Sequence, residues 1–246
     1  MHQVDSMSPQ ERRASISLAL VFAFRMLGLF MVLPVLATYG QQLQGATPLL
    51  IGMAIGAYGL TQAVLQIPFG MLSDRIGRKP VIIFGLVLFA AGGLLAAGAD
   101  SIQQVIAGRI LQGAGAIAAA VMALVADSTR EQHRTKAMAM IGMSIGLAFA
   151  VAMVAGPVVA GIAGLGGVFL STSMLAIVGI GLVLLVVPGQ VTQADDVHRT
   201  VPQRDLAGDH LRGPEAAPGV DDLDALRNPR DHGATQGAAG QRAAAR

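Results

Sequence analysis

The sequence contains no cysteine and no tryptophan, and only two of its 246 residues are tyrosine. Without cysteine the chain can form no disulfide framework, no thiolate metal site and no cysteine nucleophile. Charge is scarce as well, because Asp, Glu, Lys and Arg make up 13% of the residues, against about 25% in soluble domains. Hydrophobic residues reach 53%, and the mean hydropathy is +0.60. These proportions exclude an ordinary soluble domain and indicate a membrane protein.

Six long apolar runs dominate the first three quarters of the chain. Each is close to the roughly 20 residues that a helix needs to cross the hydrocarbon core of a bilayer. None shows the alternation that is typical of the strands of a membrane β-barrel. We therefore expect an all-α membrane protein whose transmembrane helices lie in a lipid bilayer. The predicted spans are 15–37, 48–71, 81–99, 102–125, 137–163 and 168–187.

The basic residues mark one side of the membrane. They precede the first span, lie between the second and third spans and between the fourth and fifth, and follow the sixth, while the other three loops contain no Lys or Arg. This alternation follows the positive-inside rule and predicts that both termini are cytoplasmic. Residues 1–14 are then a cytoplasmic N-terminus and 15–188 a six-span bundle. The net charge of +2 reflects topology, and we expect no nucleic-acid partner.

The composition changes abruptly after residue 188. Residues 189–246 contain no Phe, Tyr, Trp, Ile, Met or Lys, but they contain 11 Ala and 9 acidic residues. Such a segment cannot bury enough apolar surface to offset the entropy of ordering it, so we expect a polar, disordered cytoplasmic tail. Two origins remain open: a regulatory tail, or an out-of-frame translation of GC-rich DNA, which we favour.

Two arginines lie inside predicted spans, Arg25 in the first and Arg109 in the fourth, where Gln112 follows one turn later. A charged side chain in a bilayer is costly, so each arginine marks either a functional pathway or a structural contact. For Arg25 the structural alternative is hydrogen bonding to carbonyl groups of neighbouring helices. For Arg109 it is extension of the side chain to the outer membrane surface.

Polar side chains also occur in the second span. Gln62 and Gln66 are four residues apart and share one helix face, with Tyr58 and Thr61 nearby. They either line a polar cavity or form hydrogen bonds between helices. The sequence leaves these two alternatives open.

A tight basic turn follows the second span, with the sequence GMLSDRIGRKP from Gly70 to Pro80. Gly77 permits a positive φ, and Pro80 suits the first turn of the next helix. Asp74 and Arg78 are spaced four apart and can pair. By its charge alone, the turn would be a basic loop that only fixes the orientation of the chain in the membrane.

The complete string, however, resembles the loop signature G-x-L-a-D-r-x-G-r-k-P of the major facilitator superfamily at nearly every position. Its place after the second of six spans agrees with that family as well. The residues that match the motif are Gly70, Asp74, Arg75, Gly77, Arg78 and Lys79.

Further strings resemble signatures of the drug–proton antiporter branch of this family. RILQGAG at 109–115 resembles its span-four signature, and GPVVAG at 156–161 resembles the core of its antiporter motif, although Ala152 replaces a glycine that is usual there. The run 25–36 is similar to the YajR type of efflux proteins. The resemblance extends over residues 8–188.

This resemblance implies one six-span half of a two-half transporter, with the substrate cavity between the halves. It implies proton-coupled efflux, with protons and an unidentified drug or small metabolite as partners, from a bacterial inner membrane. A cytoplasmic gate would combine the loop motif with Asp127. Gly156, Pro157 and Gly161 would bend the fifth span, because proline interrupts the helical hydrogen bonds. The expected substrate or proton pathway comprises Arg25, Tyr58, Gln62, Gln66, Arg109 and Gln112.

The alternative from another class is a non-transporting membrane fragment, or a half-transporter subunit that pairs with a second six-span chain or with itself. No Asp or Glu lies deep in a predicted span, so no proton-carrying carboxylate is evident in this half. The sequence contains no phosphate-binding loop, metal-ligand cluster or credible Ser/His/Asp arrangement. We therefore expect no enzymatic activity, no cofactor and no metal.

Overall fold

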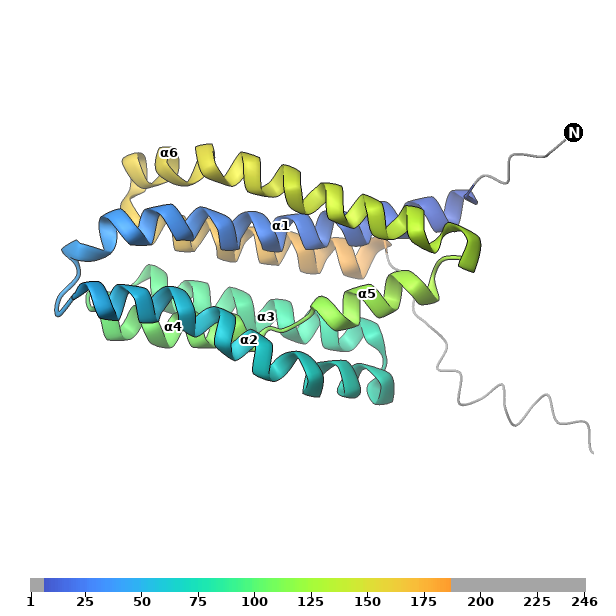
Figure 1. The fold of residues 1–246 in the computed structure, drawn as a ribbon, viewed down its shortest axis with the longest axis horizontal. Helices are drawn as coiled ribbons and strands as arrows, with labels where there is room; N and C mark the ends of the chain where they lie inside the picture. Colours follow the sequence, from blue (N-terminus) through green and yellow to red (C-terminus); the bar gives the residue numbers. More distant parts are fainter. Residues whose placement is uncertain (1–6, 187–246) are drawn as a thin grey trace, which may run out of the picture. The chain divides into compact units, whose positions relative to one another are not determined.

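The computed structural model describes residues 7–186, which are almost entirely helical. The expectations for the tail at 189–246 and for the first six residues lie outside the described residues. Three of the predicted spans, 15–37, 48–71 and 81–99, each correspond to a single helix. The elements are α1 (Pro9–Tyr39), the 3-10 turn η1 (Gly40–Gln42), α2 (Pro48–Ile76), α3 (Arg78–Ala97), α4 (Ile102–Ala114), α5 (Ala118–Asp127) and α6 (Glu131–Val186) (Figure 1).

Small polar residues determine where several helices begin. The Ser8 hydroxyl accepts a hydrogen bond from the backbone N–H of Glu11 at 3.2 Å, and the Glu11 carboxylate accepts one from the Ser8 N–H at 2.8 Å. Ser101 and Gln104 form the same reciprocal cap before α4, and the Thr47 hydroxyl caps α2. Each cap satisfies backbone N–H groups that have no partner within the helix.

The fifth and sixth predicted spans belong to α6, which is 56 residues long. Its helical dihedrals are interrupted at Gly164, where φ is 67° and ψ is −169°. The chain reverses there: the yellow segment of α6 runs along one side of α1, and the orange segment returns behind it (Figure 1). Five stretches within residues 7–186 are long and apolar enough to cross a membrane, and undivided α6 is one of them. The predicted loop between the two spans is thus a reversal centred on one glycine.

The fourth predicted span is not one continuous helix. α4 ends at Ala114 and α5 begins at Ala118, and Gly115 between them has φ −74° and ψ 52°. A Cβ atom at Gly115 would overlap the carbonyl oxygen of Gly85 on α3. The backbone of the break therefore packs directly on α3, and glycine also has a low helix propensity. The predicted span 102–125 is therefore built from two short helices, and the stretch Ile102–Asp127 is long and apolar enough to cross a membrane as one span.

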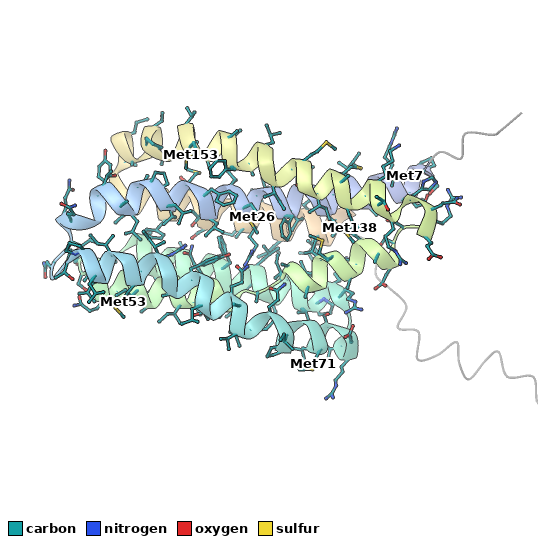
Figure 2. The ribbon with its side chains drawn as sticks, in the orientation of Figure 1. Met7, Met26, Met53, Met71, Met138 and Met153 are labelled. Carbon is teal, nitrogen blue, oxygen red and sulfur yellow. The ribbon has the colours of Figure 1, made fainter. Side chains whose placement is uncertain are left out.

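Apolar side chains fill the interior and also cover much of the surface, as expected for helices that contact lipid. Met26 is 9% exposed and lies between the helices, whereas Met53 and Met71 are 51% and 55% exposed on the outside (Figure 2). α1 packs mainly against α6, and α4 packs against α2 and α3. α2 is the least covered span, since only 17% of its most apolar stretch is buried, against 50% in α1 and α3.

Candidate functional site

Two arginine side chains lie in the interior of the bundle, and both Arg25 and Arg109 are 0% exposed. Their guanidinium groups lie against one ring: the Cζ atoms are 5.8 Å and 4.5 Å from the ring centroid of Tyr58 on α2. A cation over an aromatic face is stabilised by the charge distribution of the ring. Arg109 is therefore buried within the bundle and does not extend to the outer membrane surface.

Arg25 binds the break between α4 and α5. Its Nη2 group donates to the carbonyl oxygen of Gly115 at 3.0 Å and to Oε1 of Gln62 at 2.9 Å. A helix end leaves carbonyl groups without their usual intrahelical partners, and an arginine can satisfy them. The Cζ atom of Arg25 also lies 5.5 Å from the ring centroid of Phe89. Arg25 thus links α1 to α2, α3 and the interrupted fourth span.

Arg109 on α4 begins a chain of hydrogen bonds that reaches two further helices, α2 and α6. Its Nε group donates to the carbonyl oxygen of Ala54 on α2 at 3.3 Å, and Nη1 donates to Oε1 of Gln112 at 3.1 Å. Nε2 of Gln112 then donates to the hydroxyl of Thr172 on α6 at 3.2 Å. The predicted pair Arg109 and Gln112 therefore lies in one polar network with a residue of the last segment.

Sequence reasoning missed Thr172, which is fully buried. A single threonine in an apolar run has no distinctive pattern. The available signal was the polar triplet Ser171-Thr172-Ser173 inside the last predicted span, because polar residues in a membrane helix tend to bond to neighbouring helices. Ser173 does so, donating to the carbonyl oxygen of Ala90 on α3 at 3.0 Å.

Gln66 is placed differently from Gln62. Both are half-buried on α2, but Oε1 of Gln66 is buried and has no hydrogen-bond partner within residues 7–186. Gln62 contacts Arg25 directly. The structure therefore joins five of the six predicted pathway residues around the arginines and leaves Gln66 one turn away on α2.

The interior arginines have no carboxylate partner among the described residues. The acidic side chains of residues 7–186 lie at helix ends or in a loop, and each is outside the apolar centre of its segment. The arginines instead contact amide and carbonyl oxygens and aromatic rings. The acidic residues are Glu11, Asp74, Asp100, Asp127 and Glu131.

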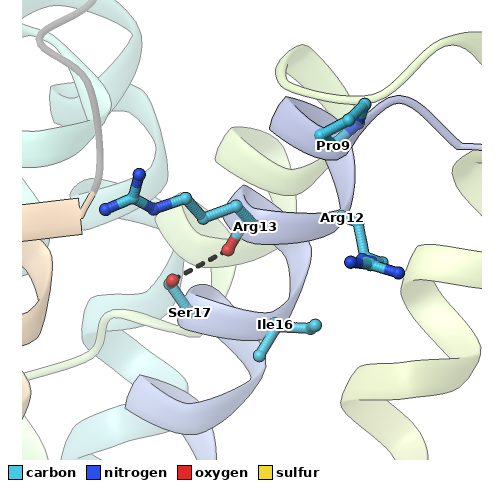
Figure 3. Close-up of a pocket in the computed structure, with 5 residues that line it drawn as sticks. All are labelled: Pro9, Arg12, Arg13, Ile16 and Ser17. Carbon is cyan, nitrogen blue, oxygen red and sulfur yellow. Dashed lines mark hydrogen bonds between the residues drawn. The ribbon is translucent and has the colours of Figure 1, made fainter.

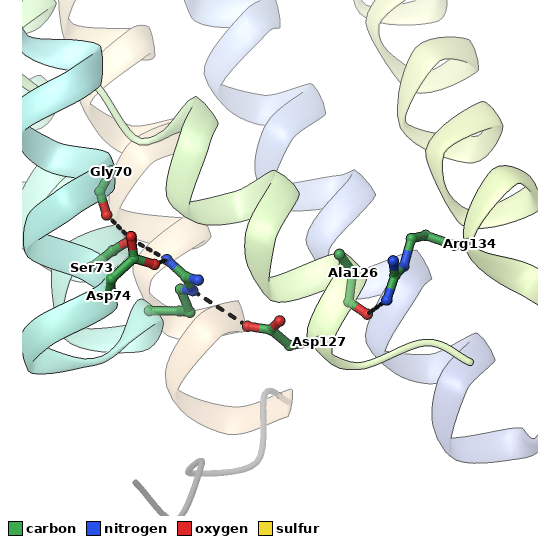
Figure 4. A network of polar contacts seen from close by, with 7 residues as sticks. Gly70, Ser73, Asp74, Ala126, Asp127 and Arg134 are labelled. Carbon is green, nitrogen blue, oxygen red and sulfur yellow. Dashed lines mark hydrogen bonds and ion pairs between the residues drawn. The ribbon is translucent and has the colours of Figure 1, made fainter. Parts of the chain in front are cut away.

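A second cluster lies where α2, α3 and α5 end or begin on one side of the bundle. Arg78 forms an ion pair with Asp74, and its Nε lies 3.3 Å from Oδ2 of Asp127. Its Nη1 donates to the hydroxyl of Ser73 at 2.7 Å, and this hydroxyl donates to the carbonyl oxygen of Gly70 at 2.7 Å. Figure 4 shows Ser73, Asp74 and Asp127 around one guanidinium group, with the Gly70 carbonyl bound to Ser73. We call Ser73, Asp74, Arg78 and Asp127 the Arg78 cluster.

The surrounding motif residues shape the turn between α2 and α3. Gly77 has φ 98°, which only glycine adopts readily, and this turn lets Arg78 begin α3. Nζ of Lys79 donates to the carbonyl oxygen of Leu184 near the end of α6 at 3.4 Å. A Cβ at Gly70 would lie 3.4 Å from Cβ of Ala119, so α2 and α5 are close there. Arg75 is exposed.

An ion pair that sequence reasoning missed joins the start of α1 to the turn before α6. Nε and Nη2 of Arg130 lie 3.0 Å and 3.1 Å from the two carboxylate oxygens of Glu11, and the Arg130 N–H donates to Glu11 at 2.9 Å. Pairing with Arg130 holds the pKa of Glu11 well below its usual range. The partners are 119 residues apart in the chain, so no local pattern links them.

The expected bend in the fifth span stays a prediction. α6 is helical through Gly156 and Pro157, and its helical dihedrals are interrupted only at Gly164. The structure gives Gly156 a packing role, because a Cβ there would lie 2.8 Å from the carbonyl oxygen of Met31 on α1. Gly161 faces open space.

A pocket of about 470 Å³ lies beside the first turns of α1, apart from both clusters (Figure 3). The hydroxyl of Ser17 donates to the carbonyl oxygen of Arg13 at 2.8 Å at its edge. Two exposed arginines border it, and none of its residues contacts the interior arginines through a hydrogen bond. The lining residues are Pro9, Arg12, Arg13, Ile16 and Ser17.

Comparison with known proteins confirms the resemblance found in the motifs. The family profile described as Major Facilitator Superfamily matches residues 18–218. The chain is 62% identical over 186 residues to the inner membrane transport protein YajR of Escherichia coli (strain K12), covering 76% of this chain and 41% of YajR. It is 43% identical over 178 residues to an uncharacterized transporter of Buchnera aphidicola subsp. Schizaphis graminum, covering 72% of this chain and 46% of that protein. The chain thus spans less than half the length of these relatives.

More distant similarities agree in fold. The chain is 30% identical over 141 residues to the class B tetracycline resistance protein of Escherichia coli, covering 56% of this chain and 34% of that protein. The crystal structure of the human organic anion transporter MFSD10 (TETRAN) superposes with a TM-score of 0.62 at 20% identity, covering 74% of this chain and 48% of that one. Likeness at this identity concerns the fold alone.

Proposed function

The chain belongs to the major facilitator superfamily, and from this premise we propose that it forms the N-terminal six-span half of a proton-coupled efflux transporter for a drug or small metabolite. The observation that carries the proposal is the polar network of Arg25 and Arg109, both buried at 0% exposure inside a largely apolar bundle. Ionisable residues at such positions in membrane proteins line substrate or ion pathways.

The reversal at Gly164 supports six crossings. It divides α6 into segments of 131–163 and 165–186, and each is long enough to cross about 30 Å of hydrocarbon. With six crossings, the loops that contain Lys and Arg all lie on one side, which is the cytoplasm by the positive-inside rule. Both termini are then cytoplasmic. The similarity to an inner membrane protein of Escherichia coli supports the bacterial inner membrane as the location.

The Arg78 cluster is the proposed cytoplasmic gate. It connects α2, α3 and α5 through one guanidinium group, so separating the cytoplasmic ends of these helices requires breaking an ion pair. Asp74 and Asp127 are 59% and 46% exposed, and each is accessible to a charge from a second half. Transport would proceed as the halves rock about the cavity between them.

A second half is part of the proposal. Leu60, Val64 and Ile67 on α2 are 63–70% exposed, and Gln66 lies half-buried on another side of the same helix, where its Oε1 has no hydrogen-bond partner within residues 7–186. An unpartnered amide suits a protein partner better than lipid, because it needs hydrogen bonds. The group that carries the proton is assigned to that half, since no carboxylate within residues 7–186 lies in the apolar centre of a span. The alternative remains a subunit that assembles without transporting by itself.

Reconstitution tests this proposal. The chain would be placed in vesicles loaded with a pH-sensitive dye, alone and together with the remainder of YajR, and challenged with a panel of small carboxylates, phosphates and cationic drugs. We expect compound-dependent proton movement only when both parts are present. Movement by the chain alone as a proven monomer contradicts the need for a second half. No movement with either preparation, despite correct assembly, contradicts proton-coupled transport.

A further inference from the structure

We propose that the interior arginines form an anion-binding site that takes the carboxylate or phosphate group of a substrate. The site, called here the arginine cluster, consists of Arg25, Arg109, Tyr58 and Gln62. It deepens the proposed function by naming a substrate class, but binding at the cluster needs only this chain.

The two buried arginines carry positive charge without a negative partner among the described residues. Two guanidinium groups lie over the same tyrosine ring at full burial, and arginine remains protonated in proteins. Buried charges are normally paired with an opposite charge, because an uncompensated ion loses its hydration. Within residues 7–186 the nearest compensation comes from neutral oxygens and aromatic faces alone. An anion would supply the missing charge.

Several hydrogen-bond donors of the arginine cluster have no acceptor in the described part of the chain. Nε and Nη1 of Arg25, Nη2 of Arg109 and the hydroxyl of Tyr58 are all buried and have no hydrogen-bond partner in the described part of the chain. Each of these groups can donate a hydrogen bond. Four unsatisfied donors around two cations match a ligand that brings several acceptor oxygens. Carboxylate and phosphate groups have this character, and they pair with guanidinium in a forked geometry.

The interrupted fourth span adds to the positive potential. The ten-residue helix α5 begins at Ala118 without a side-chain cap, three residues after the carbonyl group that Arg25 binds. The N-terminus of a helix carries the positive end of its dipole. In transporters, such half-helix ends within the membrane face anionic groups of substrates.

Gln62 occupies the position that we assign to an oxygen of the ligand. Its Oε1 accepts a hydrogen bond from Arg25 at 2.9 Å, and the residue is half-buried on α2, the least covered span. Rotation of this one side chain would expose a guanidinium donor toward the uncovered face of α2. A neutral amide oxygen binds arginine less strongly than an anionic oxygen does, so an anion can displace it.

Thermal unfolding of the full chain in detergent tests the site. Sodium chloride would be replaced at constant ionic strength by sodium benzoate or inorganic phosphate, with benzamide as the neutral match for benzoate. We expect at least one of the two anions to raise Tm by about 3 °C near saturation, and benzamide to have no effect. Titration should give a dissociation constant that is about tenfold weaker when Tyr58→Phe removes one donor.

Variants separate the arginine cluster from other basic surfaces. Gln62→Glu supplies a carboxylate within the cluster, so it should raise Tm in chloride and abolish the further rise caused by benzoate or phosphate. Arg12→Gln, at the exposed pocket beside α1, should leave the response unchanged. Arg25→Gln and Arg109→Gln should lose the rise in Tm caused by benzoate or phosphate. If these two variants fail to fold, the Gln62→Glu variant still tests the site.

The proposal is overturned if neither benzoate nor phosphate exceeds chloride and benzamide, or if the response survives Gln62→Glu. A response lost in Arg12→Gln would assign binding to the surface and would also overturn it. The outcomes remain separate from those of the transport assay. Anion binding without transport refutes the proposed efflux function alone, whereas transport without anion binding refutes this site alone.

Discussion

At the scale of single residues, the bundle uses arginine in two ways. Arg130 and Arg78 pair with carboxylates near the ends of the helices, where water is close and the pairing fixes the turns. Arg25 and Arg109 are buried and contact only neutral groups among the described residues. The first kind joins helix ends to one another through ion pairs, while the second kind joins the helices through hydrogen bonds in the interior.

Glu11 gives the residue-scale prediction for pH. Its pKa is lowered in the folded chain from the usual value of 4.5, mainly by Arg130. The ionised form therefore stabilises the fold fully above pH 4.5, and this contribution declines as pH falls toward the lower folded pKa. Glu11→Gln should lower Tm at pH 7, and the difference from the original chain should shrink below pH 4.5.

Thermal unfolding between pH 3 and pH 7 measures this difference. Glu131→Gln provides the control, because Glu131 also lies in the first turn of a helix but is exposed. Its effect on Tm at pH 7 should be smaller than that of Glu11→Gln. An equal effect from the two variants would show that Arg130 does not determine the stability contributed by Glu11.

At the scale of elements, the break between α4 and α5 depends on glycine. A Cβ at Gly115 would overlap the backbone of α3, whereas a Cβ at Gly161 would meet nothing. Gly115→Ala should therefore destabilise the chain by about 1–3 kcal/mol, the usual cost of overpacking. Gly161→Ala should be neutral or stabilising by up to about 1 kcal/mol, because alanine has the higher helix propensity.

Equilibrium unfolding of both alanine variants in one detergent gives the comparison. Arg25 adds a second readout, since its hydrogen bond to the Gly115 carbonyl requires the break. If Gly115→Ala were as stable as the original chain, the close approach of the break to α3 would not constrain the fold.

The elements also show how far the sequence could predict this molecule. Apolar runs predicted α1, α2 and α3 well, because membrane crossing requires long apolar helices. The break at Gly115 was not predicted, because its cause is contact with Gly85, which is remote in the chain. Thr172 and the Glu11–Arg130 pair were missed for the same reason. Motif spacing pointed to the Arg78 cluster, but the hydroxyl of Ser73 within it could be placed only by the turn geometry.

At the scale of the whole molecule, the number of times the chain crosses the membrane determines on which side each loop lies. The absence of cysteine allows a direct measurement, since an introduced cysteine is the only thiol in the chain. Ala163→Cys, next to the reversal at Gly164, and Ser101→Cys should both react with a membrane-impermeant maleimide in intact cells. Ser128→Cys should react only after the membrane is permeabilised. Labelling of Ser128→Cys but not Ala163→Cys in intact cells would contradict the proposed orientation.

Assembly with a second half gives another whole-molecule prediction. Oε1 of Gln66 is buried without a partner on the uncovered span α2, so removing the amide should help the chain when it is alone. Gln66→Leu should stabilise the isolated chain by about 1 kcal/mol and reduce its co-purification with the remainder of YajR. Val64→Leu, on the exposed face of the same helix, should change neither property. Unchanged co-purification of Gln66→Leu would place the second half elsewhere.

The short helix α5 is held by an arginine at each end. Arg78 lies 3.3 Å from its last residue, Asp127, and Arg25 binds Gly115 just before its first turn. Ten helical residues form a stiff rod about 15 Å long. A helix this short moves as a rigid body, so a displacement of one end of α5 is transmitted to its other end. We therefore expect a rearrangement of the Arg78 cluster to be felt at the hydrogen bond between Arg25 and Gly115, which lies just beyond the other end of α5.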